Sequence, residues 1–174
     1  MINKYGFIHE AGEIMVLILF VIRRLPQAVT LSELTELAMC DDGISYFDVT
    51  DCINKLVNTG HLKHEDEKFS LTLKGERNGE ILEKELPCSV KEKAEAAASL
   101  VRAAQVRNSM IKTNHEILED GACSVILSLS DGISEIISIN LIAANEKQAG
   151  DIKRGFRKNA EKIYKTIIEM ATKS

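Results

Sequence analysis

ISYFDVTDCINKLVNTGHLKHEDEKFSLTL, residues 44–73, is the segment around which the rest of the chain is organised. Its apolar residues recur four and three positions apart, as on one helical face, at Val49, Ile53 and Leu56. Ser45 stands where the N-cap of that helix would lie, and Asp48 follows three residues later, a weaker relative of the capping box. Gly60 stands where a helix that ends near Asn58 needs a left-handed residue. We therefore expect a helix that begins at Ser45.

Two short strands are expected after this helix, over residues 61–65 and 68–73. Their predicted inward side chains are Leu62, Phe69, Leu71 and Leu73. The three residues Glu65-Asp66-Glu67 form a tight polar tip between the strands. A helix followed by a two-stranded ribbon is the second half of a winged helix-turn-helix.

The preceding residues supply the other parts of such a domain. Residues 11–25 are so apolar that we expect a central helix covered on most sides, which Pro26 ends. Thr30-Leu31-Ser32-Glu33 is a capping box that opens a short helix through Met39. Residues 40–43 form the turn to Ser45, and residues 3–9 are either an edge strand or a short arm. The predicted order is helix, helix, turn, helix, strand, wing, strand.

Two sequence patterns carry a family resemblance. The pattern V-x3-I-x2-L-x3-G-x-L over residues 49–62, followed by SLTLKG over residues 70–75, resembles the recognition helix and wing of PadR-like and MarR-like winged-helix transcription regulators. These families often end the wing with Leu-Thr-x-x-Gly, which the LTLKG of residues 71–75 fits. The whole chain is similar to an uncharacterised bacterial winged-helix family that carries a domain-of-unknown-function label. The resemblance implies a winged helix over residues 10–85 and supplies no biochemical activity.

The pattern of apolar residues starts again near Leu86-Pro87, which indicates a domain boundary. We therefore predict a winged-helix domain at residues 1–86 and an α+β dimerisation or effector domain at residues 87–174. A heptad-like stripe then runs along a predicted helix over residues 90–112. It consists of Val90, Ala94, Ala97, Val101, Ala104, Asn108 and Ile111. The stripe either packs on its own chain or forms a dimer seam.

Two Asp-Gly turns, at residues 120–121 and 131–132, predict a three-stranded antiparallel meander. The expected strands cover residues 115–118, 122–129 and 134–143. Strand parity favours three-residue loops, which pair Ile117 with Cys123 in the first hairpin; in the second they set Val125 against Ile137 and Cys123 against Ile139.

A last helix is expected over residues 145–172. Its predicted buried stripe is Ile152, Phe156, Ile163, Ile167 and Met170. Its basic side is either a solvated face or a contact to nucleic acid or an acidic partner; it carries Lys153, Arg154, Arg157, Lys158, Lys162 and Lys165. The complete prediction is an α+β chain in which a winged helix-turn-helix precedes a helix, meander, helix unit.

The candidate DNA-contacting residues lie on the helix after Ser45 and on the wing. They are Ser45, Tyr46, Thr50, Asn54, Lys55, Asn58, Lys63 and Lys68. A dimer could also present a scattered basic rim of Arg23, Arg24, Lys55, Lys63, Lys68 and Lys74. The net charge of the N-terminal half argues against DNA binding, because DNA affinity comes largely from basic side chains that contact phosphates. Residues 1–87 contain 9 Lys and Arg against 15 Asp and Glu, a net −6, and residues 88–174 contain 13 against 11, a net +2.

Two functions are therefore expected as alternatives: a dimeric, cytoplasmic DNA-binding regulator, or a winged helix that binds protein instead of DNA. A small-molecule effector or a protein partner of the C-terminal half is left open. The sequence has no phosphate-binding loop and no nucleophile elbow, and no metal-ligand spacing, so we expect neither an enzyme nor a cofactor or metal. Nine residues, 14–22, form the longest apolar run, too short to span a bilayer. Four reduced, mostly buried thiols are expected at Cys40, Cys52, Cys88 and Cys123.

Overall fold

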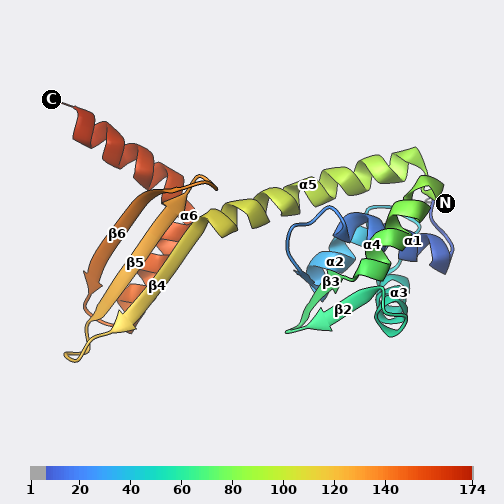
Figure 1. The fold of residues 1–174 in the computed structure, drawn as a ribbon, viewed down its shortest axis with the longest axis horizontal. Coiled ribbons are helices and arrows are strands. Elements are labelled where there is room, and N and C mark those ends of the chain that lie inside the picture. The colour runs from blue at the N-terminus through green and yellow to red at the C-terminus, as the bar shows by residue number, and fades with distance from the viewer. Residues whose placement is uncertain (1–6, 174) are drawn as a thin grey trace, which may run out of the picture. The chain divides into compact units, whose positions relative to one another are not determined.

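The computed structural model describes residues 7–173, which form an α+β fold with two small antiparallel sheets (Figure 1). The chain divides into two compact units, of which the first ends at Gln105 and the second begins at Val106.

The N-terminal unit is built around one apolar helix. Its elements follow the order α1 (Ala11–Ile22), β1 (Val29–Thr30), α2 (Leu31–Ala38), α3 (Tyr46–Asn58), β2 (Leu62–Glu65), β3 (Lys68–Leu71), α4 (Leu73–Leu82), the 3-10 turn η1 (Glu83–Glu85) and α5 (Cys88–Met110). Helix α1 is buried continuously from Val16 to Ile22 and contacts α2, α3 and α4. The expected buried face of α3, Val49, Ile53 and Leu56, is confirmed. The Thr30–Glu33 capping box is confirmed as well.

Strand β1 is absent from the sequence prediction. It pairs antiparallel with β3 through Val29 and Phe69, so the sheet order is β1-β3-β2. Of the expected arm at residues 3–9, residues 3–6 lie outside the described part of the chain. Phe7 and Ile8 are held by their backbone N–H groups, which donate to the buried Asp41 carboxylate at 2.6 and 3.1 Å. A side-chain acceptor thus ties this segment to the turn between α2 and α3.

Helix α5 begins where the second domain was expected, but its first half belongs to the N-terminal core. Its buried side chains Val90, Ala94 and Ala98 join the same apolar cluster as α1 and α3. The predicted boundary at 86/87 therefore differs from the structural division at 105/106. In the first half of α5 the predicted heptad-like stripe therefore packs on its own chain, and its buried residues are four positions apart. Farther along the stripe, Ala104 and Asn108 are exposed.

The C-terminal unit consists of a three-stranded sheet and one long helix. Its strands are β4 (Ile111–Ile117), β5 (Cys123–Ser130) and β6 (Glu135–Ala143), in the order β4-β5-β6. Helix α6 (Glu146–Thr172) lies against one face of this sheet (Figure 1). The first hairpin has the predicted register, because Ile117 pairs with Cys123 and Gly121 is left-handed with φ of 81°.

The second hairpin has the predicted faces but the wrong register. Val125 pairs with Leu141, and not with Ile137 as expected, so β6 is shifted by four residues along β5. The loop is longer than predicted: Ser130 pairs with Glu135, and the Asp131 carboxylate accepts the N–H groups of Ile133 and Ser134, both at 2.8 Å. A register irregularity at Leu129/Ser130 accompanies this turn. Because the shift is an even number, each side chain keeps its face.

The predicted apolar stripe of α6 is only partly buried. Phe156 is buried, whereas Ile167 is exposed and Met170 is 73% exposed. Asn159 has non-helical backbone angles, and a kink there interrupts the helical periodicity. The expectation that Ile167 and Met170 lie in the core of this chain is therefore wrong.

All four cysteines are free thiols. Cys52 and Cys123 are buried, Cys40 is half-buried and Cys88 is exposed. Within residues 7–173, no helix combines the length and the apolar character that crossing a membrane requires.

Candidate nucleic-acid interface

The start of α3 is fixed by Ser45. Its hydroxyl oxygen accepts the Asp48 backbone N–H at 3.2 Å and donates its own proton to the Asp48 carboxylate at 2.6 Å. This satisfies one of the free N–H groups of the first turn and places a negative charge at the positive end of the helix dipole. The Ser45 hydroxyl is thus already hydrogen-bonded, and Asp48 stays at the tip of the helix.

The outer face of α3 offers polar side chains that have no internal partner. Asn54, Lys55 and Asn58 are exposed, and no side-chain hydrogen bond or ion pair engages them within residues 7–173. Thr50 is half-buried and its hydroxyl donates to the Phe47 carbonyl at 2.9 Å. An amide with free donor and acceptor atoms on a helix surface can read an adenine edge bidentately, and of the predicted residues Asn54 and Asn58 meet this condition.

The β2–β3 hairpin lies beside α3 and is acidic at its tip. The turn residues Asp66 and Glu67 both have positive φ, 48° and 61°. Lys63 forms an ion pair with Glu65 at 2.8 Å, whereas Lys68 is exposed and has no ion pair in the described part of the chain. Of the two predicted wing lysines, Lys68 is therefore the freer one to meet a phosphate.

A groove of about 500 Å³ lies between α3, the first turn of α2 and the hairpin. It is lined by Thr30, Leu31, Ser32, Thr50, Asn54, Val57, His64, Glu67 and Phe69. The His64 ring stacks on Phe69, with centroids 4.3 Å apart. The structure thus brings Thr50 and Asn54 together with the hairpin, while Tyr46 lies at the N-terminal end of α3 and Asn58 at its C-terminal end.

Four of the six residues of the basic rim expected from the sequence have partners within the described part of the chain, namely Arg23, Arg24, Lys63 and Lys74. Arg23 pairs with Glu76 at 3.1 Å and with Glu83 at 2.8 Å. Arg24 pairs with Glu95 and lies 3.4 Å from the centroid of the Phe20 ring. Lys74 donates to the Thr59 carbonyl at 2.7 Å. The arginine contacts join the end of α1 to α4, η1 and α5, and the Lys74 contact joins α4 to the end of α3, so we assign these three residues to the packing of the unit.

Phe47 is the notable surface residue that the sequence interpretation missed. It is 79% exposed in the first turn of α3, and its ring meets Tyr46 edge-on with centroids 6.0 Å apart. The signal was available, because Phe47 lies outside the buried series Val49, Ile53 and Leu56. Large exposed aromatic side chains are enriched at protein interfaces.

The fold and this surface define a two-unit α+β protein with an exposed helix-and-hairpin surface in its N-terminal unit. The chain belongs to the family described as Domain of unknown function (DUF4364), whose model matches residues 14–170. No curated protein and no solved structure matches it.

Proposed function

We propose that the protein is a dimeric DNA-binding transcriptional regulator with an N-terminal winged helix-turn-helix. One observation carries the proposal: the order α1, β1, α2, α3, β2, β3 with the sheet order β1-β3-β2. This order supports a helix-turn-helix formed by α2 and α3, followed by a hairpin wing. In such a domain the second helix enters the major groove by its N-terminal residues.

The exposed side chains suggest a division of roles at DNA. Asn54 would read a base, most favourably adenine. Tyr46 would contact a base or the backbone, and Lys55 and Lys68 would meet phosphates. Lys63 would have to leave Glu65 first. Ser45 would present the capped end of α3, Thr50 would lie beside Asn54 in the groove, and Asn58 would lie at the margin.

Few phosphates can be neutralised by this surface, because Lys55 and Lys68 are its best-placed free cations. Each neutralised phosphate contributes about −0.9 to the slope of log affinity against log salt, so one protomer should give a slope of roughly −2. Asp48, Asp51 and Glu67 would further weaken non-specific attraction. The proposal is therefore a protein of low non-specific affinity that depends on base contacts.

The C-terminal unit supports the dimer part of the proposal. A groove of about 630 Å³ runs between the sheet and α6, with apolar walls that include Leu127, Ile139, Leu141, Phe156 and Ile163. The same helix continues into the exposed Ile168 and Met170. One unit thus carries both a groove and an apolar projection, and a self-complementary two-fold interface can be built from such a pair.

Light scattering tests this dimer at tens of micromolar protein, a concentration that detects moderate affinity. We expect a dimer for the wild type and a monomer for Ile167→Glu, which places a charge in the groove. Ile133→Glu is the matched control, because Ile133 lies at a hairpin tip and is 96% exposed. A monomeric wild type contradicts the dimer, and so does an Ile167→Glu variant that remains dimeric.

Selection of genomic DNA fragments on the purified protein, at low and at moderate salt, tests DNA binding. We expect a shared sequence element to be enriched at both salt concentrations. Absence of any enriched element at low salt would refute the proposal.

The second candidate function is a winged-helix module that binds a protein, and the exposure of Phe47 beside Tyr46 favours it. Acidic neighbours, Asp48 and Asp51, would suit a basic partner. Phe47→Ala separates the candidates: it should abolish a protein interface centred on this pair, whereas DNA reading through Asn54 should survive it.

A further inference from the structure

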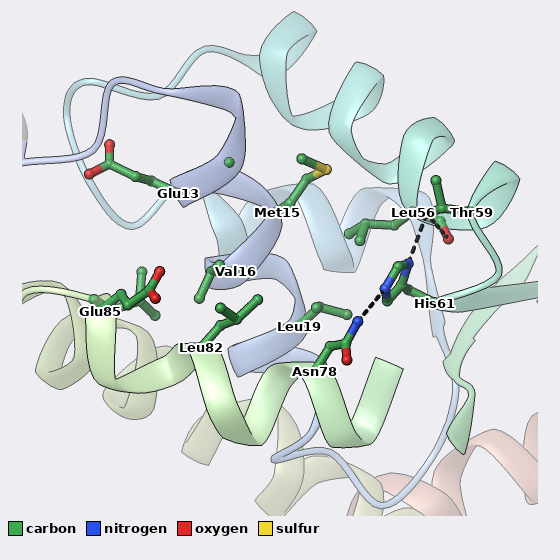
Figure 2. A pocket seen from close by; sticks show the side chains of 12 residues that line it. Glu13, Met15, Val16, Leu19, Leu56, Thr59, His61, Asn78, Leu82 and Glu85 are labelled. Atoms are coloured by element: carbon green, nitrogen blue, oxygen red, sulfur yellow. Dashed lines mark hydrogen bonds between the residues drawn. The ribbon is translucent and has the colours of Figure 1, made fainter. Parts of the chain in front are cut away.

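A second cavity, of about 460 Å³, lies in the N-terminal unit away from the exposed face of α3 (Figure 2). Its walls come from α1, from the end of α3 and from α4, and its volume is in the usual range of about 300–1,000 Å³ for small-molecule sites. The apolar lining residues are Met15, Val16, Leu19, Leu56, Leu82 and Leu86. Four of these six are buried, Val16, Leu19, Leu56 and Leu86, so the cavity has an apolar floor that belongs to the core.

Helix α4 is held close to its neighbours by glycines. A β-carbon at Gly75 would lie 2.2 Å from the His61 carbonyl oxygen, and one at Gly79 would lie 2.7 Å from Arg23 Cδ. These close approaches fix the first part of α4 against β2 and α1. The cavity lies between α1 and the later part of this helix, at Asn78 and Leu82 (Figure 2). The packing of α4 against its neighbours therefore sets the width of the cavity, and a ligand does not have to open it.

One end of the cavity is polar and uncharged. His61 Nδ1 lies 2.8 Å from Thr59 Oγ1, and His61 Nε2 lies 2.8 Å from Asn78 Nδ2. The Thr59 hydroxyl proton is donated to the Lys55 carbonyl at 2.7 Å, so Nδ1–H donates to Thr59 and Nε2 accepts from the Asn78 amide. Burial, with a smaller effect of Lys74, lowers the pKa of His61. The imidazole is therefore neutral at pH 7 and its two nitrogens already have partners.

The opposite end carries negative charge, where Figure 2 shows Glu13 and Glu85. The Glu13 carboxylate accepts the backbone N–H groups of His9 and Glu10 at 3.0 and 3.1 Å. These bonds lower the pKa of Glu13, which keeps it ionised. Glu85 is exposed and has no ion pair within residues 7–173. No lysine or arginine is among the described residues that line the cavity.

We propose that this cavity binds a small amphipathic cation. An amine or quaternary ammonium group would lie beside Glu13 and Glu85, and an apolar body would lie between α1 and α4 with its far end at the His61 ring. The charge pattern disfavours an anion, since a carboxylate or phosphate would face two carboxylates without a cation. This inference concerns ligand binding alone and stands apart from the proposed DNA function.

Calorimetric titration of the full chain with three probes of equal chain length tests the charge preference: octyltrimethylammonium, 1-octanol and octanoate. The two ionic probes are kept below their micelle concentrations and octanol below its solubility limit. We expect the cation to bind at least about tenfold more tightly than octanoate, because like charges are rejected, and octanol to fall between them. Equal or tighter binding of octanoate would overturn the proposal, as would failure of the cation to bind.

Variants and spectra locate the site. Glu85→Gln should weaken binding of the cation by up to about fivefold, the range of one solvent-exposed ion pair, and leave the affinity for octanol unchanged. Glu80→Gln is the matched control, an exposed α4 carboxylate that does not line the cavity, and should change neither. In ¹H–¹⁵N spectra of the wild type, cation-induced shifts should centre on Gly12, Asn78 and Leu82. Equal effects of the two substitutions, or shifts confined to the C-terminal unit, would overturn the assignment.

Discussion

Substitution of Glu67 by glycine should stabilise the protein. The β2–β3 hairpin closes through Asp66 and Glu67, both with positive φ, between the paired residues Glu65 and Lys68. A left-handed conformation costs a residue with a β-carbon about 1–2 kcal/mol, and aspartate tolerates it better than glutamate. Glycine removes this cost at position 67 but loses about 0.5–1 kcal/mol more chain entropy on folding. The expected net gain is roughly 0.5–1 kcal/mol.

Urea unfolding followed by circular dichroism measures this gain. With a denaturant slope of about 1–3 kcal/mol per molar, the midpoint for Glu67→Gly should rise by roughly 0.2–1 M. The matched control is Glu67→Gln, which removes the charge but keeps the β-carbon, and its midpoint should not rise. A rise in both variants would show that charge and not backbone conformation is responsible. A lower midpoint for Glu67→Gly would refute the reasoning.

Two further predictions concern the stability of the N-terminal unit. Asp41→Ala should destabilise it by about 2–4 kcal/mol, because the N–H groups of Phe7 and Ile8 lose a charged acceptor that is only 2% exposed; a change below about 0.5 kcal/mol in urea unfolding would contradict this. The lowered pKa of His61 means that the native state binds this proton more weakly than the unfolded chain, whose histidine has a pKa of about 6.5. Its contribution to stability is thus present above that pH and is lost as the pH falls. Between about pH 7.5 and 5.5 the urea midpoint of the wild type should fall more than that of His61→Gln, and equal falls would count against the assignment.

Local features of the fold could be predicted from the sequence because they depend on neighbouring residues. The cap at Ser45, the capping box at Thr30 and the turn at Gly121 each involve groups within a few positions of one another. The faces of the C-terminal strands follow from the two-residue period alone.

Features that depend on distant residues were missed. Strand β1 has two residues, and its partner Phe69 lies 40 positions away from Val29, so no local pattern marks it. The β5–β6 register was wrong because the loop at Asp131 is longer than the three residues predicted, and a register irregularity accompanies it at Leu129/Ser130. The domain boundary differs because alanines at α5 positions 94 and 98 reveal nothing about which core they join.

The candidate site shows the same difference between features set by neighbouring residues and features set by distant ones. Position along α3 was sufficient to place Asn54 and Lys55 on its exposed face. The sequence could not show that Arg23 and Arg24 are held by Glu76, Glu83 and Glu95, because these partners lie on α4, η1 and α5. These ion pairs take Arg23 and Arg24 out of the basic rim, so the proposed DNA contact depends on fewer cations than the sequence suggested.

The affinity of Asn54→Ala for the duplex enriched in the genomic selection is the most direct test of DNA reading by α3. The matched control is Asn108→Ala, an exposed asparagine on α5 that is outside the proposed interface. Loss of one bidentate base contact in each protomer should weaken binding of Asn54→Ala by about 1–3 kcal/mol per contact, with relaxed preference at one base pair of each half-site, while Asn108→Ala binds like the wild type. Equal affinities of both variants and the wild type would contradict base reading by Asn54 and favour the protein-binding alternative.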